Sequence, residues 1–471
     1  MPTRFRVIYL LFVYFGIRVF SFFFQPATPL SSNANLLNSF LTLAIVAATA
    51  YLFYKKNILG WYVVAGEIIL GGTGNFIQVF GITLRSLLLI MSLTIYFYRN
   101  YRTVFSLRND QLIIGEMLFI AALGLLRGWY FSNMHSIIIS DAIPYLFLLF
   151  YFPLRDLLKS DSWRKFCYTA LQAAILGSAI FMLIAYFSFA SGLFQVQDAF
   201  YHWYRDVAGG KITPIGFNFF RFVLNEQLLL IPILLYFLSG VMAEKGRVAL
   251  TLATSILLLF VLSLNLTRIY LIALVVGILV LFTRNNWKRW LAVSVGSLAV
   301  FLTIFSSLFF IASGGRSLGL EFFGLRLQSV IDPNLEESSF SRMLLLPKIL
   351  EQIIQHPLLG RGLGSTVAIF SPVENRIITT SHYDWGYLEI LAELGIIGFS
   401  IWVLFLIKIA SRLKNLPRWQ SAAFVSLLVI NITSPAVSHV LGLILLTLLF
   451  ALGSNASSEQ SVELSRTPEL L

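Results

Sequence analysis

The stretch HPLLGRGLGSTVAIFSPVENRIITTSHYDWGYLEILAELGIIGFSIW, His356 to Trp402, concentrates polar chemistry in a chain that is otherwise mostly apolar. A proline and three glycines open it, and glycine permits tight turns that leave backbone amides uncovered. A polar loop follows and carries Ser381, His382 and Asp384 to the start of an apolar helix. We therefore expect a turn, a polar loop and a membrane-entering helix in this order, with a site where they meet.

The composition around this stretch defines the class of protein. Of 471 residues, 58% are hydrophobic and 12% are charged, and the mean hydropathy is +0.82. These values exclude a soluble protein and predict an all-α, polytopic membrane protein. The single cysteine, Cys167, excludes an internal disulfide and a cysteine-based metal site. The net charge of +12 is typical of basic cytoplasmic loops, and we expect no nucleic-acid partner.

Apolar windows of about 20 residues, the length that crosses a bilayer, predict 12–14 transmembrane helices. Basic Arg4 and Arg6 precede the first window, but no small-residue cleavage pattern follows by Phe24, so we expect a retained span rather than a signal peptide. The predicted spans are 7–24, 37–54, 58–80, 82–98, 111–127, 135–153, 166–190, 221–239, 247–264, 268–283, 290–313, 386–409, 419–433 and 437–452.

Clusters of lysine and arginine occupy every second loop between these spans. By the positive-inside rule these loops and both termini are cytoplasmic, which leaves segments 193–220 and 314–385 outside. The predicted organisation is an N-terminal group of transmembrane helices (1–313), one large extracytoplasmic loop with short helices (314–385), C-terminal transmembrane helices (386–452) and a cytoplasmic tail without structure (453–471).

Several arginines fall at the outward ends of predicted spans: Arg85, Arg127, Arg221 and Arg268. An arginine near hydrocarbon is costly unless it reaches the interface or meets a partner, so several at one membrane face suggest a shared anion. The alternative is that they reach the interface individually or pair with an acid, the candidates being Glu67, Glu116 and Glu226. Arg268 follows a polar turn and has no acid nearby in sequence, which favours the anion.

Within the large loop, residues 336–355 predict an interfacial helix. Ser338 or Ser339 can cap it, Arg342 and Lys348 decorate it, and an apolar stripe runs along it. The stripe comprises Met343, Leu346, Ile349, Leu350 and Ile353. The helix should stop at Pro357.

The glycines that follow, Gly360, Gly362 and Gly364, leave two interpretations open: the turn binds phosphate through its amides, or it only reverses the chain. All five histidines lie on the outer side in this topology: His135, His202, His356, His382 and His439. A lone loop histidine is usually a surface residue, but the position of His382 between a glycine turn and a membrane-entering helix favours a functional role.

Three segments together resemble the O-antigen ligase and polymerase superfamily of bacterial membrane glycosyltransferases. They are Thr267–Gly277, the Arg342 helix with Pro357–Gly362, and His382 followed by Leu388–Gly398, in which a Leu-Glu-x-x-x-Glu-x-Gly-x-x-Gly pattern occurs. The resemblance covers roughly 267–402. It departs from the family pattern at His356, at Tyr383 and at Ile269–Tyr270, which bears on the subfamily more than on the superfamily.

The resemblance implies a multi-pass enzyme of the bacterial cytoplasmic membrane whose active site faces the periplasm. Such an enzyme transfers a glycan from undecaprenyl diphosphate to an acceptor hydroxyl, as a polymerase or as a ligase, and needs no cofactor. The implied partners are the lipid-linked glycan, an acceptor glycan or lipid, membrane lipids, and a chain-length regulator or other envelope assembly proteins.

The residues supply the chemistry that this reaction needs. Arg268, Arg221 and Arg342 offer planar cationic forks for a diphosphate. No Asp-x-Asp pair occurs in the chain, so we expect metal independence. His382 is the candidate general base, and Asp384 or Glu389 is expected to orient it. Gly360, Gly362 and Glu389 are the expected positioning residues.

The sequence leaves two alternatives open, one for the function and one for the aromatic segment. A lipid-linked oligosaccharide flippase would also have about fourteen spans and outward arginines, but it should show two similar halves and short loops, which this chain lacks. The aromatic residues between Asp198 and Asn218 either stack on sugar rings or belong to the interfacial aromatic belt, and we favour the belt.

Overall fold

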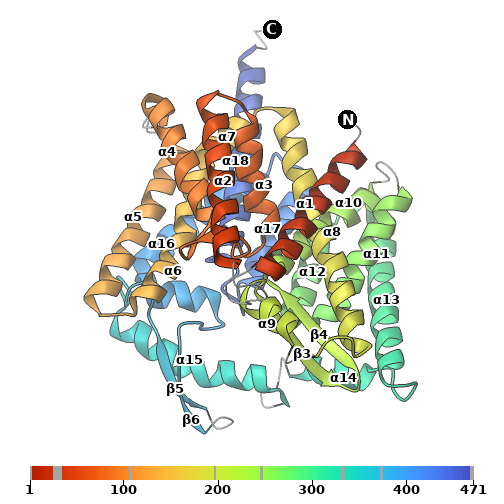
Figure 1. Ribbon diagram of the computed structural model, residues 1–471. Helices are drawn as coiled ribbons and strands as arrows, with labels where there is room; N and C mark the ends of the chain where they lie inside the picture. Colours follow the sequence, from red (N-terminus) through yellow and green to blue (C-terminus); the bar gives the residue numbers. More distant parts are fainter. Residues whose placement is uncertain are drawn as a thin grey trace. The chain divides into compact units, whose positions relative to one another are not determined.

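The computed structural model describes residues 3–24, 34–104, 109–195, 198–243, 248–329, 332, 335–371 and 375–466 (Figure 1). Its helices are α1 (Thr3–Phe24), α2 (Ala34–Tyr54), α3 (Leu59–Leu70), α4 (Leu84–Val104), α5 (Asn109–Tyr130), α6 (His135–Leu146), η1 (Phe147–Phe150), α7 (Tyr151–Leu157), α8 (Asp161–Ala190), α9 (Ala199–Asp206), η2 (Asn225–Leu229), α10 (Leu230–Met242), α11 (Val248–Asn265), α12 (Arg268–Val280), η3 (Arg284–Asn286), α13 (Trp287–Ala312), α14 (Leu320–Gln328), α15 (Glu337–Gln355), α16 (Gly386–Leu413), α17 (Arg418–Ile430) and α18 (Val440–Arg466). Three antiparallel two-stranded hairpins complete the description: β1 (Gln78–Val79) with β2 (Ile82–Thr83), β3 (Gly210–Gly216) with β4 (Phe219–Leu224), and β5 (Val367–Ser371) with β6 (Arg376–Thr380).

The helices confirm the predicted class. Nine helices of the described chain are long and apolar enough to cross a membrane, and four shorter apolar helices accompany them. The protein is therefore an all-α, polytopic membrane protein, and the predicted count of 12–14 spans requires the shorter helices as well as the long ones.

The chain divides into two compact units, each built from separate stretches of sequence. Unit 1 comprises Met1–Tyr101, Ser160–Tyr270 and Leu281–Gly319, and unit 2 comprises Arg102–Lys159, Leu271–Val280 and Leu320–Leu471. The division at 313, 385 and 452 predicted from the sequence follows membrane topology instead, and it stays a prediction.

In unit 1, α8 packs against α1 and α3, and α11 packs against α10 and α13. A buried ion pair joins Arg18 to Glu226, and the Tyr14 hydroxyl donates to Glu226 Oε2 at 2.7 Å. Breaking a buried pair leaves an uncompensated charge, so these three side chains depend on one another. The sequence pointed to Glu226 as a partner for an arginine but did not identify Arg18.

The predicted span 221–239 is wrong at its start, because Arg221 lies in strand β4 and the α-helix begins at Leu230. Residues Gly210–Leu224 form a hairpin in which Phe219 and Phe222 are buried. A window of about 20 residues averages over the alternation of a short strand, so its apolar side chains are counted with those of the following helix.

Two further expectations need correction. The predicted serine cap of α15 is wrong, because Glu336 holds the N-cap position. The expectation of a tail without structure from Gly453 is wrong as far as Arg466, where α18 ends. Asn455 Nδ2 donates to the Arg155 carbonyl at 2.8 Å, which ties the extended helix to α7.

In unit 2, a crossing of two backbones organises the helices. At Gly395 the dihedral angles φ 66° and ψ −174° interrupt α16. The freed carbonyls of Ala392 and Glu393 accept the N–H groups of Arg361 and Gly362, both at 2.9 Å. In return, the N–H of Ile396 donates to the Pro357 carbonyl at 2.9 Å. The turn that precedes the β5–β6 hairpin is therefore hydrogen-bonded to the backbone of α16 where that helix is interrupted.

Glycine is required at this crossing because a Cβ would overlap backbone atoms. At Gly362, with φ +90°, a Cβ would lie 2.1 Å from the Gly128 nitrogen of α5. At Gly395, with φ +66°, it would lie 2.4 Å from the Leu358 carbonyl. Both a left-handed φ and a backbone contact shorter than van der Waals distance exclude larger residues.

We predict that Gly362→Ala destabilises unit 2. The left-handed φ alone costs an alanine about 1–3 kcal/mol, and the overlap with α5 adds to this cost. Gly115→Ala is the matched control, because a Cβ there meets nothing within 4 Å and the residue lies inside α5. Thermal unfolding in detergent should give a lower midpoint for Gly362→Ala and an unchanged or higher one for Gly115→Ala; equal midpoints would contradict the role of the crossing.

Candidate functional site

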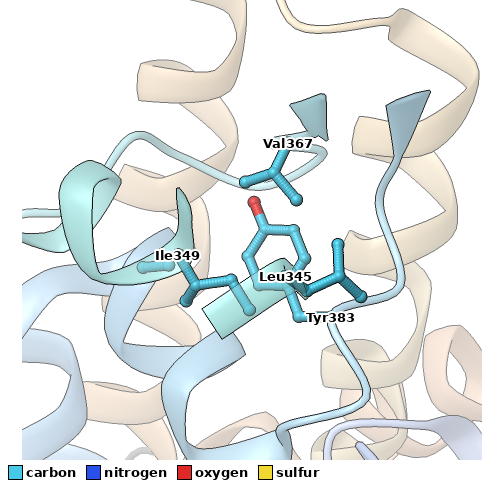
Figure 2. Close-up of a cluster of buried hydrophobic side chains, with 5 residues drawn as sticks. Leu345, Ile349, Val367 and Tyr383 are labelled. Atoms are coloured by element: carbon cyan, nitrogen blue, oxygen red, sulfur yellow. The ribbon is translucent and has the colours of Figure 1, made fainter. Parts of the chain in front are cut away.

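The segment that carries His382 is anchored by its neighbour Tyr383. Figure 2 shows the Tyr383 ring among Leu345 and Ile349 of α15 and Val367 of β5, and all four side chains are buried. The phenol lies within hydrogen-bond distance of Ser365 Oγ at 2.8 Å and donates to Gln352 Oε1 at 3.3 Å. Burial raises the pKa of this phenol above its usual range, so it stays protonated.

His382 itself is exposed, in contrast to the buried Tyr383 beside it. Its backbone N–H donates to Thr380 Oγ1 at 3.1 Å, which fixes the end of β6. Asp384 adopts a left-handed conformation with φ +56°, which aspartate tolerates better than most residues. This turn directs the chain into α16 two residues later, so the histidine lies at the rim of a defined corner.

Asp384 faces Arg342 rather than His382. Arg342 Nε lies 3.6 Å from Asp384 Oδ2, and Trp385 Nε1 donates to the Arg342 carbonyl at 3.3 Å. Among the described residues, His382 makes no hydrogen bond to Asp384 or Glu389. The assignment of either acid as the partner that orients His382 therefore stays a prediction.

Acidic side chains of α6 and α16 lie close to the Tyr383 backbone and to the glycine turn. Glu389 Oε2 accepts the Tyr383 N–H at 3.4 Å. The Gly364 N–H donates to Asp141 Oδ2 of α6 at 3.1 Å and to Glu393 Oε1 of α16 at 3.2 Å. Asp141 also interacts with Glu393 by a hydrogen bond and with His382 electrostatically. Sequence reasoning missed Asp141 and Glu393, although an acid inside an apolar span is a functional signal by itself.

The glycine turn does not present free amides to a ligand. Five consecutive N–H groups each donate within the protein: Gly360 to the His356 carbonyl (3.0 Å), Arg361 to Ala392 (2.9 Å), Gly362 to Glu393 (2.9 Å), Leu363 to Gly124 (2.9 Å), and Gly364 to the two carboxyl groups. The phosphate-binding interpretation of this turn is therefore wrong. The turn instead connects α5, α6 and α16 through these hydrogen bonds, and the positioning role expected of Gly360 and Gly362 stays a prediction.

Arg127 also supports the turn. Its Nε and Nη2 both donate to the Gly360 carbonyl, at 3.0 and 2.7 Å, and its guanidinium lies over the Phe131 ring. The His356 ring packs against the same Phe131 ring, and the two ring centroids are 4.7 Å apart. Partial burial and the charge of Arg127 lower the pKa of His356, so this imidazole is neutral at neutral pH. Arg127 thus has a structural partner rather than an anion.

The predicted diphosphate-binding arginines are divided between the units. Arg342 lies in unit 2 with His382, whereas Arg221 and Arg268 lie in unit 1. Arg221 Nε donates to the Asn265 carbonyl at 2.8 Å and its Nη2 donates to Thr267 Oγ1 at 2.9 Å. Arg268 is the first residue of α12 and follows this loop directly. The structure therefore gives Arg221 a role in holding the turn that presents Arg268.

Arg85, the remaining outward arginine, donates to the Glu67 carbonyl at 3.3 Å and is buried in unit 1. The aromatic segment is equally internal. Trp203 and Tyr204 are buried, and Phe200 stacks on Phe194 with centroids 4.8 Å apart. These rings form part of the core of unit 1, which excludes Trp203 and Tyr204 as an open platform for sugars.

Within the part of the chain that the structure describes, no group of three or more His, Cys, Asp or Glu side chains is arranged to hold a metal ion. Metal independence of the reaction nevertheless stays a prediction, because a metal can be held jointly by a substrate.

Unit 2 thus brings an exposed histidine, an arginine that faces Asp384, and acids bound to the glycine turn to the segments at the start of α16. Residues 253–403 match the O-antigen ligase family model. This match confirms the resemblance over the region that contains Arg268, Arg342 and His382, and it indicates glycan transfer of the O-antigen ligase and polymerase type. No curated protein and no solved structure matches the chain significantly.

Proposed function

We propose that this protein transfers a glycan from an undecaprenyl diphosphate-linked donor to an acceptor hydroxyl at the outer face of the bacterial cytoplasmic membrane. The product would be a surface polysaccharide of the O-antigen or exopolysaccharide kind. The observation that carries the proposal is that the matched region, 253–403, contains both the exposed histidine and the arginines that this chemistry requires. A flippase would have no need of a base on a rigid corner.

The reaction forms a bond between the acceptor oxygen and the anomeric carbon of the donor sugar. The bond from that carbon to the diphosphate breaks, and its electron pair stays on the diphosphate oxygen. His382 accepts the acceptor proton as general base and later releases it to water. Because His382 is exposed at the end of a hairpin fixed by Tyr383, its imidazole is accessible to a large glycan while its backbone is held.

Arginine supplies the second half of the chemistry. A diphosphate gains charge as it leaves, and a planar guanidinium binds two of its oxygens at once. We assign this role to Arg268, which begins α12, and to Arg342, whose Nε lies 3.6 Å from Asp384 Oδ2 and makes no hydrogen bond among the described residues. Arg221 supports the loop before Arg268. This arrangement would neutralise the leaving group without a metal ion.

The orientation that we propose places His382 in the periplasm. Within unit 2, the end opposite the glycine turn carries basic residues: Arg412 pairs with Asp110 at 2.7 Å, and the Arg155 carbonyl accepts a hydrogen bond from Asn455 of α18. α18 ends far from the β5–β6 hairpin in the view of Figure 1. Basic residues favour the cytoplasmic side, which supports the hairpin side as the outer one.

Labelling of introduced cysteines tests this orientation. We expect Asn375→Cys to react with a membrane-impermeant maleimide in intact cells and Lys414→Cys to react only after permeabilisation. The native Cys167 is buried and should contribute little background. The reverse pattern would invert the topology and remove the support for a periplasmic site.

Deletion of the gene in its host should alter the surface polysaccharide and distinguish the two kinds of transfer. On gels, loss of long chains with retention of single repeats would identify a polymerase. Free polymer that accumulates on the lipid carrier would identify a ligase. A deletion strain with an unchanged polysaccharide profile would contradict the proposed function.

Single substitutions should separate proton removal from diphosphate binding. We expect His382→Ala to lower turnover by roughly 10²- to 10⁴-fold with little change in donor affinity, because the base is lost. Arg268→Ala should lower turnover and weaken donor binding, and Arg268→Lys should restore little because a point charge cannot make paired bonds.

The matched controls are His202→Ala and Arg205→Ala, since both side chains are exposed on α9. They should retain wild-type turnover in membranes that contain equal amounts of protein. Near-normal turnover of His382→Ala under the same conditions would show that another group activates the acceptor.

A further inference from the structure

A second imidazole lies beside His382 in unit 2. His439 ends the loop between α17 and α18, and its ring centroid is 6.3 Å from that of His382. Both side chains are exposed to solvent. Among the described residues, neither imidazole has a hydrogen-bond partner in the protein. Two histidines that are distant in sequence thus share one accessible corner without being bonded to anything there.

The backbone that carries His439 is fixed to the element that follows His382. The Val437 N–H donates to Asn431 Oδ1 at 3.1 Å, and the His439 carbonyl accepts the Leu443 N–H at 3.0 Å. Asn431 is buried against Gly386, the first residue of α16, where a Cβ would lie 2.5 Å from Asn431 Oδ1. The distance between the two imidazoles is therefore set by packed backbone rather than by free loops.

The surroundings of His439 fix its protonation state. Desolvation by the neighbouring protein, with a smaller contribution from His382, lowers the pKa of His439 to about 4. A neutral imidazole has one N–H donor and one nitrogen acceptor. Because His439 is neutral at neutral pH, it can bind a hydroxyl group but is a poor acceptor for its proton.

The spacing fits one hydroxyl group between the rings. A ring nitrogen lies about 1 Å from its centroid, and hydrogen bonds from nitrogen to oxygen are about 2.9 Å long. An oxygen atom can therefore reach a nitrogen of each ring at once, off the line between the centroids. Such an oxygen would have one partner that takes its proton and one that orients it.

We propose that His439 is an acceptor-binding residue, which hydrogen-bonds the saccharide hydroxyl that His382 deprotonates. This proposal rests on the proposed function and adds the acceptor subsite to it. A purely structural histidine at this position would be expected to hydrogen-bond the protein, and among the described residues the His439 imidazole has no such partner. The occupant is a hydroxyl-rich sugar, because the neutral His439 imidazole offers no charge to a phosphate.

Two substitutions separate hydrogen bonding from packing. His439→Phe keeps a planar ring of similar size and removes both nitrogen atoms, whereas His439→Gln loses the ring and keeps a donor and an acceptor. His135→Ala is the control for an exposed histidine elsewhere in unit 2. All proteins are purified at full length, and thermal midpoints are measured first.

The assay uses lipid-linked glycan extracted from the deletion strain as donor, at saturating concentration. The acceptor is the same glycan, or the lipid A core fraction of that strain if the gels identify a ligase. We expect His439→Phe to raise the acceptor KM by roughly 3- to 10-fold, the effect of one hydrogen bond, with the donor KM unchanged. His439→Gln should recover most of this loss.

The opposite order, in which His439→Phe behaves as wild type and His439→Gln is impaired, would assign His439 to packing and overturn the proposal. Equal impairment of both variants together with lower thermal midpoints would also overturn it. Absence of transfer by the wild-type protein would refute the proposed function instead. Wild-type transfer that is lost in His382→Ala but unaffected in His439→Phe would refute only the acceptor subsite.

Discussion

The arrangement of unit 2 depends on the hydrogen-bonded crossing between the Gly360–Gly364 turn and the interruption of α16 at Gly395. Inside a membrane protein, an interrupted helix leaves backbone groups that water cannot satisfy, so another segment has to satisfy them. Here N–H groups of the turn donate to the free carbonyls of α16, and the Pro357 carbonyl just before the turn accepts the N–H of Ile396. Since glycine alone permits the close approach, the crossing requires a particular set of glycines rather than a general flexibility.

This constraint explains how a long polar loop can hold His382 at a fixed position. The first part of α16, from Gly386 to the interruption, is held by the turn at one end and by Asn431 at the other. The loop between the turn and α16 is then restrained at both of its ends, and the Tyr383 core holds its middle against α15. Discontinuous helices occur at the binding sites of other membrane proteins for the same reason, because irregular backbone is tolerated where it lines a cavity.

Most long spans and the helix α15 could be predicted because apolar length and helical periodicity are properties of contiguous sequence. His382 was singled out because its neighbours are unusually polar for this chain, and its role as a base stays a prediction. The β3–β4 hairpin was missed because Phe219 and Phe222 alternate with other apolar residues, which a 20-residue window averages away. The β5–β6 hairpin did show β-branched runs around a turn, but the predicted large loop was assigned only helices.

Other features lay beyond sequence reasoning because they depend on contacts between distant residues. An isolated glycine inside a helical pattern is usually tolerated, so the sequence around Gly395 did not predict an interruption of the helix. The interruption depends on the contacts of this segment with the Gly360–Gly364 turn. The partners of Arg127 and Arg221 are backbone carbonyls and a threonine hydroxyl, which no charge pattern reveals. The pairing of His382 with His439 likewise follows from the fold alone.

The central claim is that the protein makes and breaks glycosidic bonds rather than moving lipid-linked glycans. The most direct measurement is mass spectrometry of the products formed by the purified protein in liposomes that contain lipid-linked glycan from its host, with EDTA present. The account predicts a longer or transferred glycan together with released undecaprenyl diphosphate, both dependent on His382. Movement of intact lipid-linked glycan across the bilayer, with no new glycosidic product, would contradict it.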